Sequence, residues 1–198
     1  MTEKEKMIAG KVYNCLDEEL STALRKAKQL CHKYNDIFFE DEAAAKKIID
    51  ELLQAEHNDG YCVFTPSFWC DYGFNIKVGK NFYSNHNLVI LDCAEVRFGD
   101  NVFIGPNCGF YTAIHPIDAR QRKMEIEWAK PIKVGNDVWF GGSVTVLPGV
   151  TIGDNVVIGA GSVVVKDIPS GVVAVGNPCK PIRKITEADK LNLNDPNV

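Results

Sequence analysis

Apolar residues recur at every sixth position along much of the C-terminal half of the chain. From residue 134 the sequence divides without insertion into VGNDVW, FGGSVT, VLPGVT, IGDNVV, IGAGSV and VVKDIP. The first place of each hexad is apolar, the fifth is small or β-branched, and glycine fills the second place in four of the six. A period of six fits neither a helix nor simple alternation, so it indicates short strands joined by tight turns and stacked coil upon coil.

The same register extends towards the N-terminus. FGDNVF, IGPNCG and FYTAIH begin at Phe98, Ile104 and Phe110, and a looser block begins at Val78 and slips by two residues after Ile90. Gly and Asn recur where such a chain must turn sharply or adopt a positive φ. Stacked parallel strands satisfy one another's backbone groups, so the stack forms its own core. A β-sandwich of short strands would instead show turn signals about every 8 to 12 residues.

Residues 1–60 have helical periodicity instead. A helix capped by Asp17 would place four apolar residues on one face, Leu20, Leu24, Ala27 and Leu30. Residues 40–55 predict a second helix with one apolar face, Ala44, Ile48, Leu52 and Ala55. Two short helices cannot form a core alone, so they should pack on the stack or close one end of it. We therefore expect a helical segment over 1–60, a mainly β coil stack over 61–185 with an excursion at 116–131, and a polar tail over 186–198, the chain passing from strand to helix after Pro178.

The excursion interrupts the repeat with charged residues and one large aromatic, Trp128. Long insertions without their own repeat are usually functional in compact domains, although a solvated surface loop fits the charges equally well. His115 stands where this loop leaves the stack. An isolated histidine is more often structural than catalytic, but a side chain at the root of a protruding loop lines any cleft that the loop forms. His115 is therefore the candidate for proton transfer.

Composition excludes several functions. Lys and Arg number 22 against 26 Asp and Glu, which gives a net charge of −4 and no basic patch for a nucleic-acid partner. The seven cysteines are scattered without a CxxC pair, as in a reducing compartment, and no apolar run has the length of a signal peptide or a membrane span. These features predict a cytoplasmic protein with no membrane partner. A zinc site fails on ligand count, because only His86 and His115 lie in the repeat region.

The hexads occur together with the segments "YTAIHP", "NFYSNHN", "CDYGFNI" and "KEKMIAGKVYNCLDEEL". This combination resembles the maltose and galactoside O-acetyltransferases from residue 4 to about residue 185. Hexads alone are shared by all hexapeptide-repeat acyltransferases, whereas the N-terminal segment and "HPID" are typical of the sugar group. The resemblance implies a left-handed parallel β-helix of triangular cross-section and a homotrimer with active sites between subunits. It also implies acetyl-CoA as co-substrate, direct acetyl transfer to a sugar hydroxyl, and a loop that reaches over the adjacent subunit.

The resemblance also implies roles for individual residues. His115 would be the general base, Asn85 would bind the acceptor hydroxyl or steady the intermediate, and the Gly142 N–H would stabilise the oxyanion. An Asn in a turn of the coil is equally compatible with Asn85. Coenzyme A would contact Trp139, Gly142, Ala160, Val165, Lys166, Lys180 and Arg183. The acceptor would meet Asp17, Arg25, Asp71, Tyr83, Asn85, Asp92 and Glu127.

Three positions depart from the galactoside enzymes. Asp71 and Glu127 differ from the residues found there, and Cys93 replaces an acidic residue beside Asp92. These departures favour maltose or glucose as acceptor. A galactoside, a xenobiotic or a glycan precursor remains an alternative acceptor, and a non-catalytic trimeric scaffold remains an alternative function. A scaffold, however, would need neither the loop nor His115.

Overall fold

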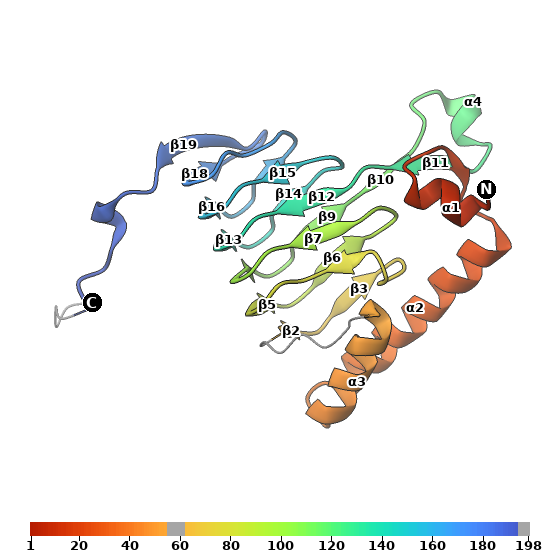
Figure 1. The fold of residues 1–198 in the computed structure, drawn as a ribbon, viewed down its shortest axis with the longest axis horizontal. Coiled ribbons are helices and arrows are strands. Elements are labelled where there is room, and N and C mark those ends of the chain that lie inside the picture. The colour runs from red at the N-terminus through yellow and green to blue at the C-terminus, as the bar shows by residue number, and fades with distance from the viewer. Residues whose placement is uncertain (55–61, 194–198) are drawn as a thin grey trace.

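The computed structural model describes residues 1–54 and 62–193. Short parallel strands form three sheets that wrap around one axis, which confirms a mainly β, left-handed parallel β-helix with a small helical segment (Figure 1). Within each coil the chain runs from face 1 to face 2 to face 3. We call the turn after a face 2 strand corner 2–3 and the turn after a face 3 strand corner 3–1.

The faces contain the following strands. Face 1 contains β4 (Ile76–Lys77), β7 (Val96–Phe98), β12 (Ile132–Val134) and β15 (Thr151–Ile152). Face 2 contains β2 (Cys62–Phe64), β5 (Phe82–Ser84), β8 (Phe103–Ile104), β13 (Val138–Phe140), β16 (Val156–Ile158) and β18 (Val172–Val175). Face 3 contains β3 (Phe68–Cys70), β6 (Leu88–Leu91), β9 (Gly109–Tyr111), β14 (Thr145–Val146) and β17 (Val163–Val164).

The hexad register sets the core. The first and fifth residues of every hexad from residue 134 are buried, from Val134 to Ile168. Large aromatic rings continue this core through the lower coils, with centroids 5.2, 4.9 and 5.2 Å apart along the series Phe82, Phe98, Phe110 and Phe140. Each inward side chain therefore packs on the coils above and below it, so removing one coil would expose its neighbours.

The turns use the fourth place of the hexad. Its residues adopt a left-handed backbone conformation, at Asn101, Asn107, Asp137, Ser143, Gly149, Asn155 and Gly161. Asn and Gly tolerate this region better than other residues do, which explains their recurrence. The Asn101 side chain accepts from Asn81 Nδ2 at 2.9 Å and donates to Asp137 Oδ1 at 2.8 Å, so polar side chains also connect successive turns.

Helices α2 (Glu18–Ile37) and α3 (Glu42–Leu53) close the N-terminal end of the stack (Figure 1). Asp17 caps α2 by accepting from the backbone N–H groups of Glu19 and Leu20, as predicted. The Tyr34 hydroxyl donates to Phe64 O at 2.8 Å. Helix α2 therefore satisfies a backbone group of the first coil as well as covering it.

The apolar face of α3 differs from the prediction by one residue. The buried positions are Ala45, Ile49, Leu52 and Leu53. The expected Ala44 and Ile48 are only partly buried, and Ala55 lies outside the described residues. Apolar residues stand next to each other along this helix, so its sequence predicts either of two neighbouring faces as the buried one. Contact with α2 and the first coil selects between them.

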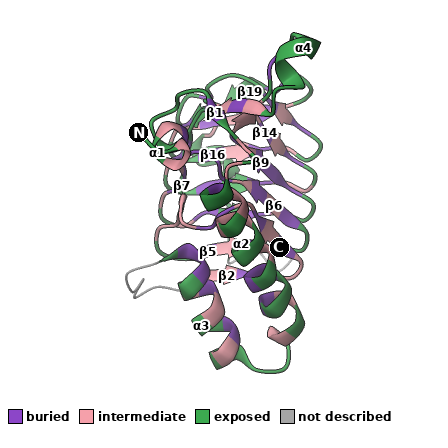
Figure 2. Ribbon diagram, turned by 90° about the vertical axis from the view of Figure 1, so that its right-hand side faces the viewer, coloured by how far each residue is buried: buried purple, intermediate pink, exposed green. Residues whose placement is uncertain are grey.

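The N-terminal residues and the excursion form a sheet of their own. Strand β11 (Ile126–Ala129) pairs antiparallel with β10 (Ala113–Ile114) and with β1 (Tyr13–Asn14). Helix α1 (Glu3–Ile8) packs beside β1, while α4 (Ala119–Arg122) projects away from the coils (Figure 2). The excursion is thus an antiparallel hairpin that the N-terminus holds in place.

The C-terminal end reverses direction. Strand β19 (Lys180–Lys184) pairs antiparallel with β18 and ends face 2. The short helix η1 (Glu187–Asp189) follows, so the tail passes from strand to helix as predicted, and it leads away from the coils (Figure 1). Within the described part of the chain, no helix has the length and apolar character needed to cross a membrane.

Candidate active site

His115 lies at a corner 3–1, where the excursion leaves the stack. It follows β10 directly, and Thr112 at the root of the hairpin is buried. The Thr112 hydroxyl donates to Leu91 O at 2.6 Å and accepts from Ala94 N at 3.0 Å. These bonds tie the root of the hairpin to the neighbouring coil, so the position of His115 is set by the rigid stack.

Glu127 faces the imidazole from the returning strand. Because β11 pairs antiparallel with β10, its Glu127 lies beside His115, with Nε2 and Oε2 3.4 Å apart. The His115 side chain is 57% exposed, whereas that of Glu127 is 8% exposed. A buried carboxylate next to a ring nitrogen orients the ring. One side of the imidazole is thus held by the protein and the other is open to a substrate.

Two further groups contact the Glu127 carboxylate. The Tyr13 hydroxyl donates to Oε1, and the Cys93 thiol lies 3.8 Å from the same oxygen. Burial, followed by the neighbouring Cys93 and Glu127, raises the pKa of Tyr13 far above its ordinary value. Tyr13 therefore stays protonated and remains a hydrogen-bond donor.

The polar cluster continues to Asp71. Cys93 Sγ lies 3.7 Å from Asp71 Oδ2, and Lys28 Nζ forms an ion pair with Asp71 Oδ1 at 2.9 Å. Burial and the two nearby carboxylates raise the pKa of Cys93, so its thiol connects Asp71 and Glu127 without adding charge. In residues 1–54 and 62–193, no group of three or more His, Cys, Asp or Glu side chains is arranged to hold a metal ion.

Asp92 lies beneath this cluster and has no exposed surface. Its Oδ1 accepts from the backbone N–H groups of Asp71 and Tyr72 at 2.9 and 2.8 Å. Burial is the main cause that raises the pKa of Asp92 to about 6. The residue was expected in the acceptor wall, but in this position it shapes the turn that carries Asp71 and does not itself reach a ligand.

Asp17 and Arg25 take different positions around α2. One Asp17 oxygen is occupied by the cap of the helix, and the side chain is partly exposed. Arg25 is exposed about two turns of helix further along. The structure brings together Asp71, Glu127 and His115, and it leaves Asp17 and Arg25 at the periphery.

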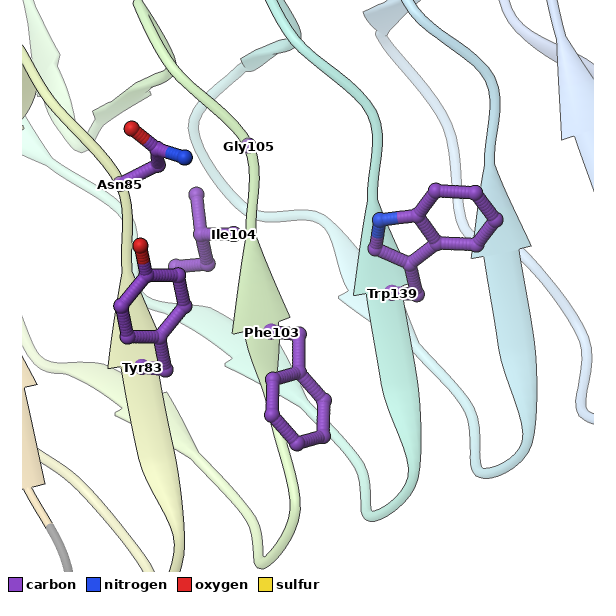
Figure 3. A pocket seen from close by; sticks show the side chains of 6 residues that line it. All are labelled: Tyr83, Asn85, Phe103, Ile104, Gly105 and Trp139. Carbon is purple, nitrogen blue, oxygen red and sulfur yellow. The ribbon is translucent and has the colours of Figure 1, made fainter.

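Tyr83 and Asn85 belong to another part of the surface. They line a groove of about 390 Å³ on face 2 together with Phe103, Gly105 and Trp139 (Figure 3). Trp139 is 57% exposed and pairs across the sheet with Phe103. Contiguous exposed aromatic groups of this kind mark a surface that binds a ligand or another chain.

Small residues continue this groove along corner 2–3. Gly142 and Ala160 occupy this corner in successive coils, and Gly161 N donates to Gly142 O at 2.9 Å. A Cβ at Gly141 would lie 2.6 Å from Ala160 N, so adjacent coils approach each other closely here. The Gly142 N–H has no hydrogen-bond partner among the described residues. It is therefore available to a ligand.

His115 and Asn85 lie on opposite edges of face 3. Asn85 follows β5 at corner 2–3, whereas His115 follows β10 at corner 3–1, with β6 and β9 spanning the face between the two corners. A strand advances about 3.3 Å per residue, so the width of the face keeps the two side chains apart. One chain alone does not bring the two predicted catalytic groups together.

The predicted coenzyme-binding residues are divided in the same way. Gly142 and Ala160 lie at corner 2–3, while Val165 and Lys166 follow β17 at corner 3–1. Lys180 and Arg183 lie on β19, where Arg183 pairs with Asp189 at 2.7 Å. This ion pair raises the pKa of Arg183 and lowers that of Asp189 to about 2. Arg183 would have to exchange Asp189 for a phosphate to bind the coenzyme.

Comparisons with known proteins agree with this architecture. Residues 6–56 match the maltose acetyltransferase hexapeptide capping motif, and residues 131–166 match the six-repeat bacterial transferase hexapeptide. A Saccharomyces cerevisiae protein named as a putative acetyltransferase is 50% identical, with 96% of each chain covered. The chain belongs to the maltose and galactoside O-acetyltransferase family.

Two solved structures of this family are similar to the acetyltransferase described here. A maltose O-acetyltransferase from Clostridium difficile 630 has 46% identity and a TM-score of 0.89 over 94% of this chain and 99% of that one. A galactoside acetyltransferase in complex with coenzyme A has 40% identity and a TM-score of 0.88 over 96% and 94% of the two chains. The resemblance inferred from the motifs is thereby confirmed.

Two residues of the acetyltransferase's polar cluster were missed in the sequence. Tyr13 is separated from Glu127 by 114 residues, and Lys28 is separated from Asp71 by 43. Neither stands in a repeat, and Lys28 resembles any charged residue on the outer face of a helix. The one available signal was Tyr13 itself, the single aromatic residue in residues 1–33.

Proposed function

We propose that this acetyltransferase transfers the acetyl group of acetyl-CoA directly to a hydroxyl of a sugar such as maltose or glucose. The observation that carries the proposal is the His115–Glu127 pair, in which an exposed imidazole is held by a buried carboxylate at the edge of the stack. The solved relatives support the substrates, since one is a maltose O-acetyltransferase and another was solved with coenzyme A.

His115 is the proposed general base. With Nε2 facing Glu127, Nδ1 is the nitrogen that takes the hydroxyl proton as the sugar oxygen attacks the thioester carbon. The Gly142 N–H stabilises the oxyanion of the tetrahedral intermediate. When the intermediate collapses, the C–S bond breaks, and the coenzyme A thiolate receives the proton from the imidazolium. No acyl-enzyme forms in this sequence.

Carboxylates and one amide are the proposed acceptor ligands. Asp71, 14% exposed and paired with Lys28, and Glu127 accept hydrogen bonds from sugar hydroxyls beside His115. Asp17 and Arg25 border the same corner more loosely, while Tyr83 and Asn85 act from the groove of a neighbouring chain. Coenzyme A follows the small residues of corner 2–3, past Trp139, and Lys166, Lys180 and Arg183 meet its phosphates.

This division of the site requires more than one chain. Because Asn85 and His115 occupy opposite edges of face 3, a neighbouring copy must bring its corner 2–3 to corner 3–1 of the first. A triangular molecule meets this condition in a three-fold ring with three equivalent sites. We therefore propose a homotrimer with an active site at each interface.

The test measures thiol release from acetyl-CoA with maltose, glucose or a thiogalactoside as acceptor. We expect His115→Ala to lower turnover by about two to four powers of ten, the usual contribution of a general base. Calorimetry should show unchanged acetyl-CoA affinity. His32→Ala is the matched control, because His32 also faces a carboxylate, Asp36 at 3.4 Å, on an exposed face of α2. Wild-type turnover in His115→Ala would remove His115 from the mechanism, and absent acetyl-CoA binding by the wild-type chain would indicate a scaffold.

A further inference from the structure

The N-terminal strand β1 places Tyr13 in the polar cluster around Glu127. In the antiparallel pair of β1 and β11, Tyr13 stands opposite Glu127. Side chains directly opposite each other in such a pair project to the same side, within contact distance. Tyr13 is 1% exposed, and its hydroxyl donates to Glu127 Oε1. The segment that caps the stack therefore also contributes a hydrogen bond beside the proposed general base.

We propose that Tyr13 is a positioning residue, which holds the Glu127 carboxylate so that Oε2 faces His115. This inference rests on the proposed function, in which His115 accepts the proton. Tyr13 binds one carboxylate oxygen and leaves the other 3.4 Å from Nε2 of His115. A carboxylate without this bond can rotate about its last torsion, because the planar group has no strongly preferred rotamer there.

Several contacts make Tyr13 suited to this role. Its own position is fixed by the β1–β11 ladder, and next to it Cys15 N donates to Glu125 O at 3.0 Å. Asn14 N donates to Glu3 Oε2 at 2.7 Å, which connects β1 to α1. Burial keeps the Tyr13 hydroxyl protonated, so it can only donate to the carboxylate. The Cys93 thiol, 3.8 Å from the same oxygen, is a weaker donor and a poor substitute.

The primary test is Tyr13→Phe, which removes the hydroxyl and keeps the ring. We expect kcat to fall by about 10- to 100-fold, the range seen when the hydrogen-bond partners of metal-bound histidines are removed, with KM for acetyl-CoA unchanged. Tyr34→Phe is the matched control, because Tyr34 is 2% exposed and its hydroxyl donates to Phe64 O at 2.8 Å, outside the cluster. It removes a buried hydrogen bond of similar kind and should leave kcat near the wild-type value.

A double-mutant cycle distinguishes positioning from general support of the fold. Tyr13 acts through Glu127, so Tyr13→Phe should cause less than about a twofold further loss of kcat in a Glu127→Ala background. A loss as large as in the wild-type background would overturn the inference, because it would show an effect independent of Glu127. Wild-type kcat in Tyr13→Phe would overturn it too.

The two proposals fail differently. If His115→Ala loses activity while Tyr13→Phe keeps it, His115 remains the base and only the role of Tyr13 is overturned. If His115→Ala retains activity, or if no sugar supports thiol release, the proposed function itself is overturned and the inference about Tyr13 with it. A kcat loss confined to Tyr13→Phe, Glu127→Ala and His115→Ala, and absent in Tyr34→Phe, supports both.

Discussion

The buried carboxylate of Asp92 makes the stability of this fold depend on pH. Asp92 is inaccessible, and its pKa of about 6 lies above the ordinary value of 3.8. The folded chain therefore retains this proton between about pH 4 and pH 6, where the unfolded chain loses it. The stabilisation from Asp92 is complete below pH 4 and disappears as the pH rises through 6. Its Oδ2 has no hydrogen-bond partner among the described residues, which fits a group that burial keeps protonated.

Asp92→Asn removes the titrating group and keeps an oxygen for the N–H groups of Asp71 and Tyr72. The difference between a pKa of about 6 in the folded chain and 3.8 in the unfolded chain corresponds to about 3 kcal/mol. The unfolding free energy of the variant minus that of the wild type should therefore rise by about 3 kcal/mol between pH 4 and pH 7. Urea titrations at equal protein concentration across this range measure the difference. A difference independent of pH would show that Asp92 does not titrate in this window.

Residue roles could be predicted from sequence only where chain topology marked them. His115 was predicted as the base because it ends a repeat at the root of an insertion. Tyr13 and Lys28 were missed, because their partners come from segments that only the folded chain brings near. Asp92 was expected in the acceptor wall, whereas its side chain is fully buried. The burial of Asp92 depends on the turn between β6 and β7, which is longer than a regular hexad turn and is therefore not described by the hexad pattern.

At the scale of the element, the fourth place of the hexad limits which residues can form a coil. Asn155 adopts φ of 52° at an exposed turn, with no side-chain hydrogen bond in the described part of the chain. We expect Asn155→Ala to lower the unfolding free energy by about 1 kcal/mol, because Cβ of alanine is strained in this region. Asn155→Gly should stay within about 0.5 kcal/mol of the wild type, since glycine accepts positive φ without strain. Chemical denaturation measures both, and equal losses would show that φ does not govern this turn.

Element prediction succeeded where the period is unique and failed where it is ambiguous. Six consecutive hexads are compatible with one register only, so the inward-facing residues predicted from Val134 onward are all buried. Helix α3 carries apolar residues in adjacent pairs, and the choice of face depends on contacts that no local pattern contains. The pairing of β1 with β11 joins the two ends of a long sequence interval, so it also depends on the completed fold.

At the scale of the whole molecule, the exposed aromatic groove and the proposed base lie at different edges of the chain. Phe103 and Trp139 are 48% and 57% exposed on face 2, beside Asn85. His115 and Lys166 lie at the other edge of face 3. A second copy that placed its corner 3–1 against this groove would cover the aromatic rings and complete the set of catalytic groups. One contact would thus account for both the apolar surface and the divided site.

Complementation between two inactive variants tests this arrangement. Asn85→Ala should lose about a hundredfold in turnover, as expected for a group that stabilises the intermediate, and His115→Ala should lose at least as much. If each site takes Asn85 from one chain and His115 from the next, a random 1:1 mixture restores both residues at some interfaces. An interface is intact when the chain that supplies Asn85 carries His115→Ala and the chain that supplies His115 carries Asn85→Ala. Each condition is met by about half of the chains, so about a quarter of wild-type activity should return.

The mixture must exchange subunits, so the two variants are denatured together and refolded, or co-expressed with different tags and purified as mixed assemblies. The control is a chain that carries both Asn85→Ala and His115→Ala, refolded with wild type at the same ratio. If the site is shared, an active interface then needs two wild-type chains, so about a quarter of the sites again survive. Recovery in both mixtures shows that the site is shared. If one chain supplied both residues, the mixed single variants would remain inactive and the control mixture would keep about half of the activity, because each site would then depend on its own chain alone.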